Sequence, residues 1–112
     1  MQQYTYLLHF NELSQAEANR YAEELRNVLL NASPEIAVQR ERDDPGTQDF
    51  GATLVLVLGT PAVVAAATAI GNWLQLRTKA SLTIETPDKK IVAQNVTRKD
   101  AARLAELFLT QR

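Results

Sequence analysis

The sequence predicts an α+β domain in which a central apolar helix packs against a small sheet, in the order β-α-β-α-β-β-α. Segments that alternate apolar and polar residues are interspersed with segments of helical periodicity. The stretch from Phe50 to Leu76 carries no formal charge, although the chain is 22% charged, so the remainder has to bury it. A length of 112 residues with 46% hydrophobic content fits a single domain, residues 1–112, with one core.

The N-terminal part predicts a strand, a helix and a second strand. Residues 4–10 alternate an aromatic and aliphatic face with a second face, as strands do. Ser14 and Glu17 have the spacing of a capping box, so a helix is expected to begin just after Ser14. Residues 36–40 return to a two-residue alternation. The packed face predicted for the helix contains Ala18, Tyr21, Ala22, Leu25, Val28 and Leu29.

Residues 41–49 form a polar segment with a Pro-Gly turn signal. It contains Asp43, Asp44 and Asp49, whose carboxylates are ligands that hard cations prefer. The segment lacks the spacing of a calcium-binding loop, so we interpret it as a solvated turn and predict no metal site.

The central apolar stretch contains one helix start and one ambiguous run. Thr60 and Pro61 are a cap and a first-turn residue, so residues 61–77 are predicted to be helical. Residues 54–58 are too short and too uniformly apolar for periodicity to decide between helix and strand. We predict helix for residues 51–58; the alternative, a strand over 53–58, gives a ferredoxin-like order. The inner face of the central helix is predicted to contain Val63, Ala67, Ile70 and Leu74.

The C-terminal part predicts a hairpin and a last helix. Residues 80–86 alternate, a Pro-Asp turn follows, and a second strand covers residues 90–94. Thr97 and Asp100 repeat the capping pattern, so we assign the glycosylation-like sequence Asn95-Val96-Thr97 to the helix cap. The inner stripe of the last helix is predicted to contain Ala101, Leu104, Ala105 and Phe108.

Composition excludes several classes of function. The chain has no cysteine, which removes disulfides, thiolate nucleophiles and thiolate metal sites. Its 12 basic and 13 acidic residues are mixed along the chain, which argues against nucleic-acid binding. The N-terminus lacks a basic region followed by an apolar run, so a cytoplasmic location is expected. No cofactor motif is present, and we expect none to be bound.

His9 is the only histidine, and no nucleophile, metalloprotease or phosphate-loop motif accompanies it. We therefore predict no catalytic residues and no enzymatic activity. The competing hypothesis is a small ferredoxin-like enzyme or ligand-binding domain, which would need a pocket that converges on His9.

The central helix is apolar on more than one side, which predicts a contact surface in addition to a core. Ala67 and Gly71 are one turn apart and allow close approach of a second helix, internal or across a dimer. Trp73 is interpreted as a core anchor or as part of an exposed patch. We predict a homodimer or larger assembly here; the alternative is insertion of residues 51–76 into lipid. The candidate interaction surface contains Val64, Ala65, Ala69, Trp73 and Leu76.

The order of parts from residue 46 to 112 resembles the bacterial effector-associated constant component family. The resemblance is carried by an apolar segment that ends in Trp73-Leu74, by Ile84-Glu85 followed by the turn Pro87-Asp88, and by a short C-terminal helix. Lys89 stands where family members commonly have glycine. The resemblance implies a non-enzymatic adaptor or scaffold of bacterial conflict systems, with an effector or NTPase protein of the same system as its partner. It implies no catalytic residues.

Overall fold

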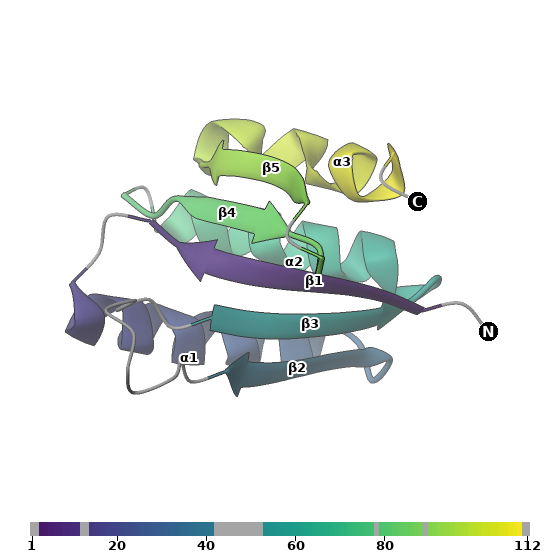
Figure 1. Cartoon of the computed structure of the whole chain (residues 1–112), viewed down its shortest axis with the longest axis horizontal. Helices are drawn as coiled ribbons and strands as arrows, with labels where there is room; N and C mark the ends of the chain where they lie inside the picture. Colours follow the sequence, from purple (N-terminus) through teal and green to yellow (C-terminus); the bar gives the residue numbers. More distant parts are fainter. Residues whose placement is uncertain (1–2, 12–13, 42–52, 78, 89, 111–112) are drawn as a thin grey trace.

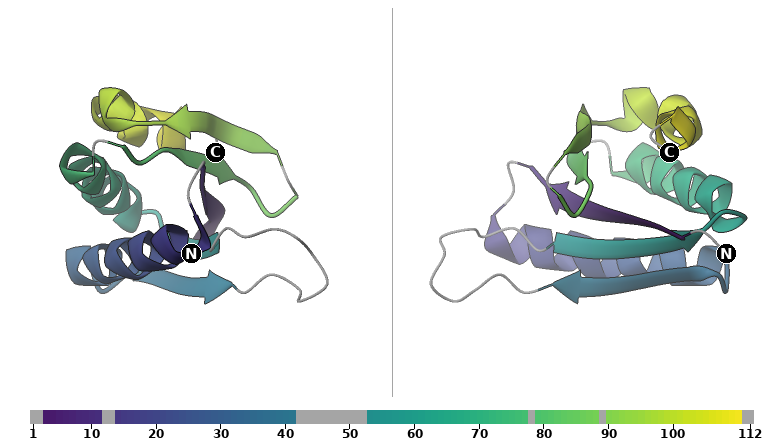
Figure 2. Two further views of the ribbon diagram at one scale, coloured as in Figure 1. Left: turned by 90° about the vertical axis from the view of Figure 1, so that its left-hand side faces the viewer. Right: turned by 45° about the vertical axis from the view of Figure 1, so that its right-hand side comes forward.

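A computed structural model describes residues 3–11, 14–41, 53–77, 79–88 and 90–110. They form a five-stranded antiparallel sheet in the order β2-β3-β1-β4-β5, and the helices lie on one face of it (Figures 1 and 2). The elements in chain order are β1 (Gln3–Phe10), α1 (Gln15–Ala32), β2 (Ile36–Glu41), β3 (Thr53–Gly59), α2 (Ala62–Leu76), β4 (Leu82–Glu85), β5 (Ile91–Val96), the 3₁₀ helix η1 (Arg98–Arg103) and α3 (Leu104–Thr110).

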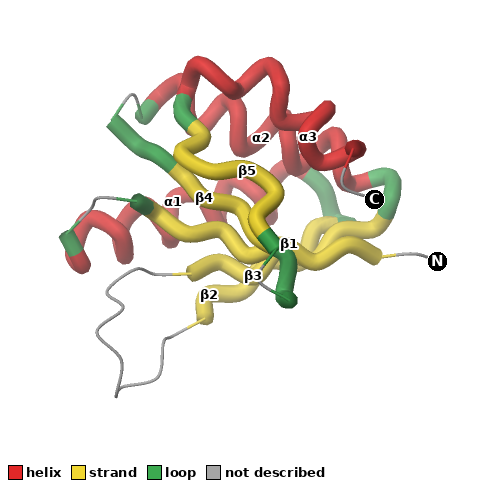
Figure 3. Tube along the Cα trace, turned by 45° about the horizontal axis from the view of Figure 1, so that its top comes forward, coloured by secondary structure: helices red, strands yellow, loops and turns green. Residues whose placement is uncertain are grey.

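The first six elements have the ferredoxin-like order β-α-β-β-α-β. α1 connects β1 to β2 and α2 connects β3 to β4, while β3 lies between β1 and β2 and β1 lies between β3 and β4. The two β-α-β units are therefore interlocked, and every hydrogen-bonded strand pair is antiparallel. β5, η1 and α3 extend this unit at the β4 edge (Figure 3). The α+β class is confirmed, with the ferredoxin-like alternative as its arrangement.

The prediction of a helix over residues 51–58 is wrong, because Thr53–Gly59 forms β3. β3 lies between two strands and carries apolar residues on both faces, so its sequence does not alternate between apolar and polar residues. Val55 and Val57 are half-buried on the face away from the helices. The fully buried side chains of the opposite face are Leu54, Leu56 and Leu58.

Two predicted caps define helix starts. The Ser14 hydroxyl accepts a hydrogen bond from the backbone N–H of Glu17 at 3.2 Å, which fixes the start of α1. Thr97 accepts from the backbone N–H of Lys99, and the Asp100 carboxylate accepts from the backbone N–H of Thr97 at 3.1 Å. The assignment of Thr97 to a helix cap is therefore confirmed, and the last helix begins as η1 before it continues as α3.

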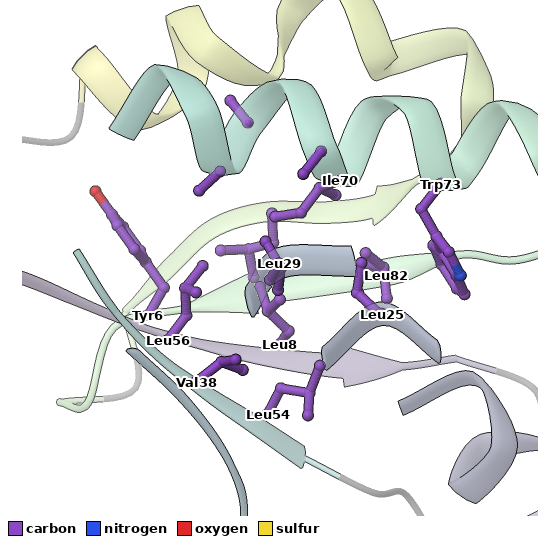
Figure 4. Packing of buried hydrophobic residues seen from close by; sticks show 14 of the residues in the cluster. Tyr6, Leu8, Leu25, Leu29, Val38, Leu54, Leu56, Ile70, Trp73 and Leu82 are labelled. Carbon is purple, nitrogen blue, oxygen red and sulfur yellow. The ribbon is translucent and has the colours of Figure 1, made fainter. Parts of the chain in front are cut away.

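α2 is covered on three sides. The sheet lies beneath it, α1 lies along one flank, and η1 and α3 lie along the other (Figure 2). Figure 4 shows Ile70 and Trp73 of α2 above a layer of leucines from α1 and the sheet. The predicted inner face is confirmed, since its members Val63, Ala67, Ile70 and Leu74 are all buried. Val28, predicted to lie on the packed face of α1, is instead exposed at its margin.

α2 and η1 approach each other closely at Gly71. A Cβ atom at this position would lie 3.1 Å from the carbonyl oxygen of Ala101 and 3.3 Å from the Ala101 Cβ. The close approach predicted for Ala67 and Gly71 is therefore internal at Gly71, where η1 replaces a partner helix.

Two hypotheses drawn from the sequence, membrane insertion and metal binding, can be compared with the structure. The helices within the described ranges are all too short or too polar to span a membrane. Asp43, Asp44 and Asp49 lie outside the described residues. Within the described residues, His, Asp and Glu side chains do not gather in a group that could hold a metal ion.

Candidate interaction surface

The sheet has a second face, which none of the described helices covers (Figure 2). Successive side chains of a strand point to opposite faces, so the residues between the buried positions of each strand share this second face. We call this surface the open face. Its described residues include Thr5, Leu7, His9, Ala37, Gln39, Thr53, Val55, Val57, Thr83, Glu85 and Ile91.

One row of the open face crosses all five strands. Gln39 of β2 lies opposite Val55 of β3, and Val55 lies opposite Leu7 of β1. Leu7 in turn lies opposite Glu85 of β4, which lies opposite Ile91 of β5. Directly opposed side chains on one face of a sheet are in contact range, so the row is continuous.

One half of the open face is predominantly apolar. Val57 lies opposite Ala37 on β2 and opposite Thr5 on β1, one row away from Val55 and Leu7. Val55, Val57 and Leu7 are half-buried by their neighbours in the sheet, whereas Ala37 is exposed. Apolar side chains at the middle of an uncovered sheet face are what a partner protein could bury.

The other half of the open face is polar and centred on His9. The His9 Nδ1 atom lies 3.2 Å from the hydroxyl of Thr53 on β3, and its Nε2 atom pairs with the Glu85 carboxylate on β4. The side chains of His9 and Glu85 are 30% and 21% exposed. The three residues therefore connect three neighbouring strands through side chains, and they fix the register of β1 against β3 and β4.

A second polar cluster continues from His9 toward the end of β1. The Asn11 amide nitrogen donates to Thr83 Oγ1 at 3.0 Å and to Ser81 Oγ at 3.2 Å. It also lies 3.3 Å from the side-chain oxygen of Asn95, which has a positive φ of 54°. Asn11 therefore joins the end of β1 to both β4 and β5, whose pairing with each other is irregular.

The order hydroxyl, imidazole and carboxylate in the His9 cluster is the order found in nucleophilic triads. Thr53, however, is only 4% exposed, so its hydroxyl is not presented to a substrate. A groove of about 320 Å³ is instead lined by residues of α2 and η1, on the helical side of the sheet, and His9 is not among its lining residues. The cluster therefore fits a cross-strand contact better than a catalytic centre.

The five residues predicted as an interaction surface do not share one environment. Val64 and Leu76 are 53% and 79% exposed, and Ala65 is half-buried. Ala69 and Trp73 are only 7% and 3% exposed, because α1 covers this flank of α2. The outward stripe between Val64 and Leu76 consists of the polar residues Thr68, Asn72 and Gln75.

Trp73 is a core anchor. Its ring makes edge contacts with Phe10 at 5.8 Å and with Tyr21 at 5.5 Å between ring centroids. Its indole N–H lies 3.3 Å from the carboxylate of Glu24 on α1. The indole therefore connects α2 to both the sheet and α1.

Arg77 completes this contact from the end of α2. Its Nε and Nη2 atoms donate to the two oxygens of Glu24 at 2.8 and 2.6 Å, a bidentate pair. Burial disfavours the charged form of Glu24, but the hydrogen bonds from Arg77 and Trp73 outweigh it and lower the pKa of the Glu24 carboxyl. The bond to Glu24 correspondingly raises the pKa of Arg77.

Comparison with known protein families identifies a match. The model of the family described as Effector Associated Constant Component 1 matches residues 14–111, which include every described element except β1. The chain belongs to this family. No curated protein and no solved structure matches the chain. The family match reaches further toward the N-terminus than the resemblance seen in the sequence, since it includes α1 and β2.

The family assignment makes the chain an effector-associated component. A surface that its own described helices leave uncovered is therefore a candidate for binding a partner. The open face was not predicted from the sequence, although part of its signal was present there. Thr5, Leu7 and His9 were seen to alternate with a buried face, but the position of β3 beside β1 was needed to place Val55 and Val57 next to them.

Proposed function

We propose that this family member is a non-enzymatic adaptor of a bacterial conflict system, which binds its associated effector through the open face. The arrangement of α1, α2, η1 and α3 on one side of the sheet is the observation that carries the proposal. It leaves the other side with an apolar half that includes Leu7, Val55 and Val57.

Apolar side chains that remain in contact with water raise the free energy of the unbound chain. Burying apolar surface stabilises a complex by roughly 25 cal/mol per Å². A partner that covers Val55, Val57 and Leu7 would therefore bind favourably, and the core would not have to change. The polar half adds hydrogen-bonding groups at Thr83 and Glu85, which can fix the orientation of the partner. An apolar centre with polar groups beside it is the usual composition of a protein interface.

The absence of catalysis belongs to the same proposal. The one histidine lies between Thr53 and Glu85, both of which already contact its ring nitrogens. Neither the His9 cluster nor the groove beside η1 combines an accessible nucleophile with a base. The chain is therefore proposed to act by binding, with one molecule engaged for each molecule of effector.

Stoichiometry tests this proposal. The purified effector encoded beside the gene is titrated with the purified chain, and the effector response is measured at an effector concentration well above the dissociation constant. An adaptor gives a response that rises until the two proteins are equimolar and then stays constant. A full response at about one-hundredth of equimolar would instead identify a catalyst that modifies the effector.

A further inference from the structure

We propose that the outer edge of β2 pairs with β2 of a second copy of this chain, antiparallel, to give a continuous ten-stranded sheet. β2 is an edge strand: it pairs with β3 along Ile36–Glu41, and none of the described segments pairs with its other side (Figure 1). An edge strand presents unpaired backbone N–H and C=O groups, which another strand can satisfy.

The two edges of the sheet differ in how they are protected. At the β5 edge, the pairing with β4 is irregular on both sides of Ile84, Asn95 has a left-handed backbone, and η1 and α3 pack against the strand. Bulges and covering elements are devices that prevent edge-to-edge association. The β5 edge is therefore a poor template for another strand.

The β2 edge has none of these devices within its described residues. Its pairing with β3 is regular over all six residues, and its sequence contains no proline, glycine or lysine. Arg40, its one basic residue, is held by α1, where it donates to Asn19 at 2.7 Å and to Glu23 at 3.4 Å. Ala37 and Gln39, on the open face, are exposed, small or neutral. A second strand can thus approach without meeting a charge repulsion.

A second copy fits this edge because a self-pairing register exists that brings no like charges of β2 together. Two identical strands related by a two-fold axis pair antiparallel. With the axis at Val38, Ala37 lies opposite Gln39 and Ile36 lies opposite Arg40 of the other copy. With the axis at Gln39, Val38 lies opposite Arg40 and Ala37 opposite Glu41. In the second register each charged residue of β2 faces an uncharged one; in the first, Glu41 would face Glu35 of the other copy, so the axis at Gln39 is favoured.

The proposed dimer leaves the central rows of the open face uncovered, because the second sheet continues in the same plane. It is therefore independent of effector binding, and its failure would not affect the adaptor proposal. The contact is small, so we expect a reversible dimer that forms in the micromolar range.

Charge substitutions on β2 test the pairing by sedimentation velocity from about 5 to about 500 μM. Gln39→Lys places lysines opposite each other in the register centred on Gln39, and Gln39→Glu does the same with carboxylates. Each variant alone should dimerise roughly tenfold more weakly than the wild-type chain. An equimolar mixture should recover the dimer, because every repulsive pair becomes attractive. This recovery distinguishes lost pairing from lost folding.

The matched control is Gln94→Lys on β5, the protected edge, which should dimerise like the wild-type chain. A cysteine-free chain also allows a second measurement: Gln39→Cys should be linked to its copy by a short bifunctional maleimide, and Gln94→Cys should not. A wild-type chain that stays monomeric over the whole range would overturn the proposal. Dimers that survive the β2 lysine but not the β5 lysine would also overturn it.

Discussion

At the scale of single residues, the structure places in different environments two side chains that the sequence assigned to one surface. Trp73 and Leu76 were both placed on the candidate interaction surface, yet one is a core anchor and the other is the most exposed large apolar residue of the described chain. The difference arises because Trp73 faces Tyr21 and Glu24 of α1, whereas Leu76 lies at the last turn of α2. The periodicity of the α2 sequence cannot show where α1 lies, so it could not distinguish these two residues.

Leu74 and Leu76 form a matched pair for testing this assignment. Leu74 is fully buried, so Leu74→Ala should lower the free energy of unfolding by about 2–5 kcal/mol. Leu76→Ala removes the same atoms from an exposed site and should change it by less than about 0.5 kcal/mol. Urea denaturation of the two variants measures both values. Equal losses would show that the inner face of α2 has been misplaced.

Glu24 should make stability depend on pH in the acid range. Its folded-state pKa lies below the ordinary value of 4.5, so the pair with Arg77 stabilises the fold above that pH and the contribution is lost as pH falls through the lowered pKa. Glu24→Gln should cost about 1 kcal/mol at pH 7, a value that allows for solvent screening at the partly exposed Arg77.

Chemical denaturation of Glu24→Gln and the wild-type chain at pH 7 and at about pH 3 measures this dependence. The difference between the two proteins should shrink at the lower pH. Glu23→Gln is the control, because Glu23 is half exposed and bridges Arg26 and Arg40 at 3.6 and 3.4 Å without contacting Trp73. A difference that grows on acidification would contradict the assigned direction of the shift.

His9→Ala tests whether the polar cluster of the open face is structural or catalytic. Removing the imidazole leaves Thr53 and Glu85 without their shared contact, so a modest loss of stability is expected, about 1 kcal/mol. Because His9 lies on the open face, the effector response is compared at saturating concentrations of the chain, where the response per bound molecule should stay unchanged. Calorimetry establishes the folded fraction, and the effector assay is run at matched folded concentration. A folded variant that still binds the effector but no longer triggers it would contradict the adaptor proposal.

At the scale of elements, most helices and strands were predictable because their signals are local. The caps at Ser14 and Thr97 and the alternation of β1 and β4 are set by neighbouring residues. β3 was not predictable in this way, since its apolar residues on both faces reflect its position between β1 and β2. The helix predicted there was wrong for that reason: the deciding contacts are distant in sequence.

The packing of η1 on α2 offers a test at this scale. Gly71→Val would place atoms against the backbone of Ala101, and the resulting displacement of η1 should cost about 1–3 kcal/mol. Asn72→Val is the control, because it introduces the same β-branched residue at the next, exposed position of α2. Thermal denaturation compares the two. A Gly71→Val variant as stable as Asn72→Val would mean that η1 does not pack closely at this position.

At the scale of the whole molecule, the sequence indicated the α+β class, a single core and the family, but not the surface proposed for binding. The open face exists only once β2, β3, β1, β4 and β5 are ordered side by side, because its row from Gln39 to Ile91 takes one residue from each strand. Some residues of the surface predicted on α2 are buried for a similar reason. α2 is apolar on more than one side because the sheet, α1, and η1 with α3 cover three of its sides.

Affinity for the effector, measured with two matched variants, tests the central claim most directly. Val57→Lys places a charge in the apolar half of the open face, and Val64→Lys makes the same change on the exposed side of α2. With both variants shown to be folded, isothermal titration calorimetry against the purified effector should give a dissociation constant raised at least about tenfold for Val57→Lys, because a buried unpaired charge costs well over 1 kcal/mol. Val64→Lys should bind like the wild-type chain. Loss of binding in Val64→Lys with normal binding in Val57→Lys would contradict the open-face account and place the effector contact on α2 instead.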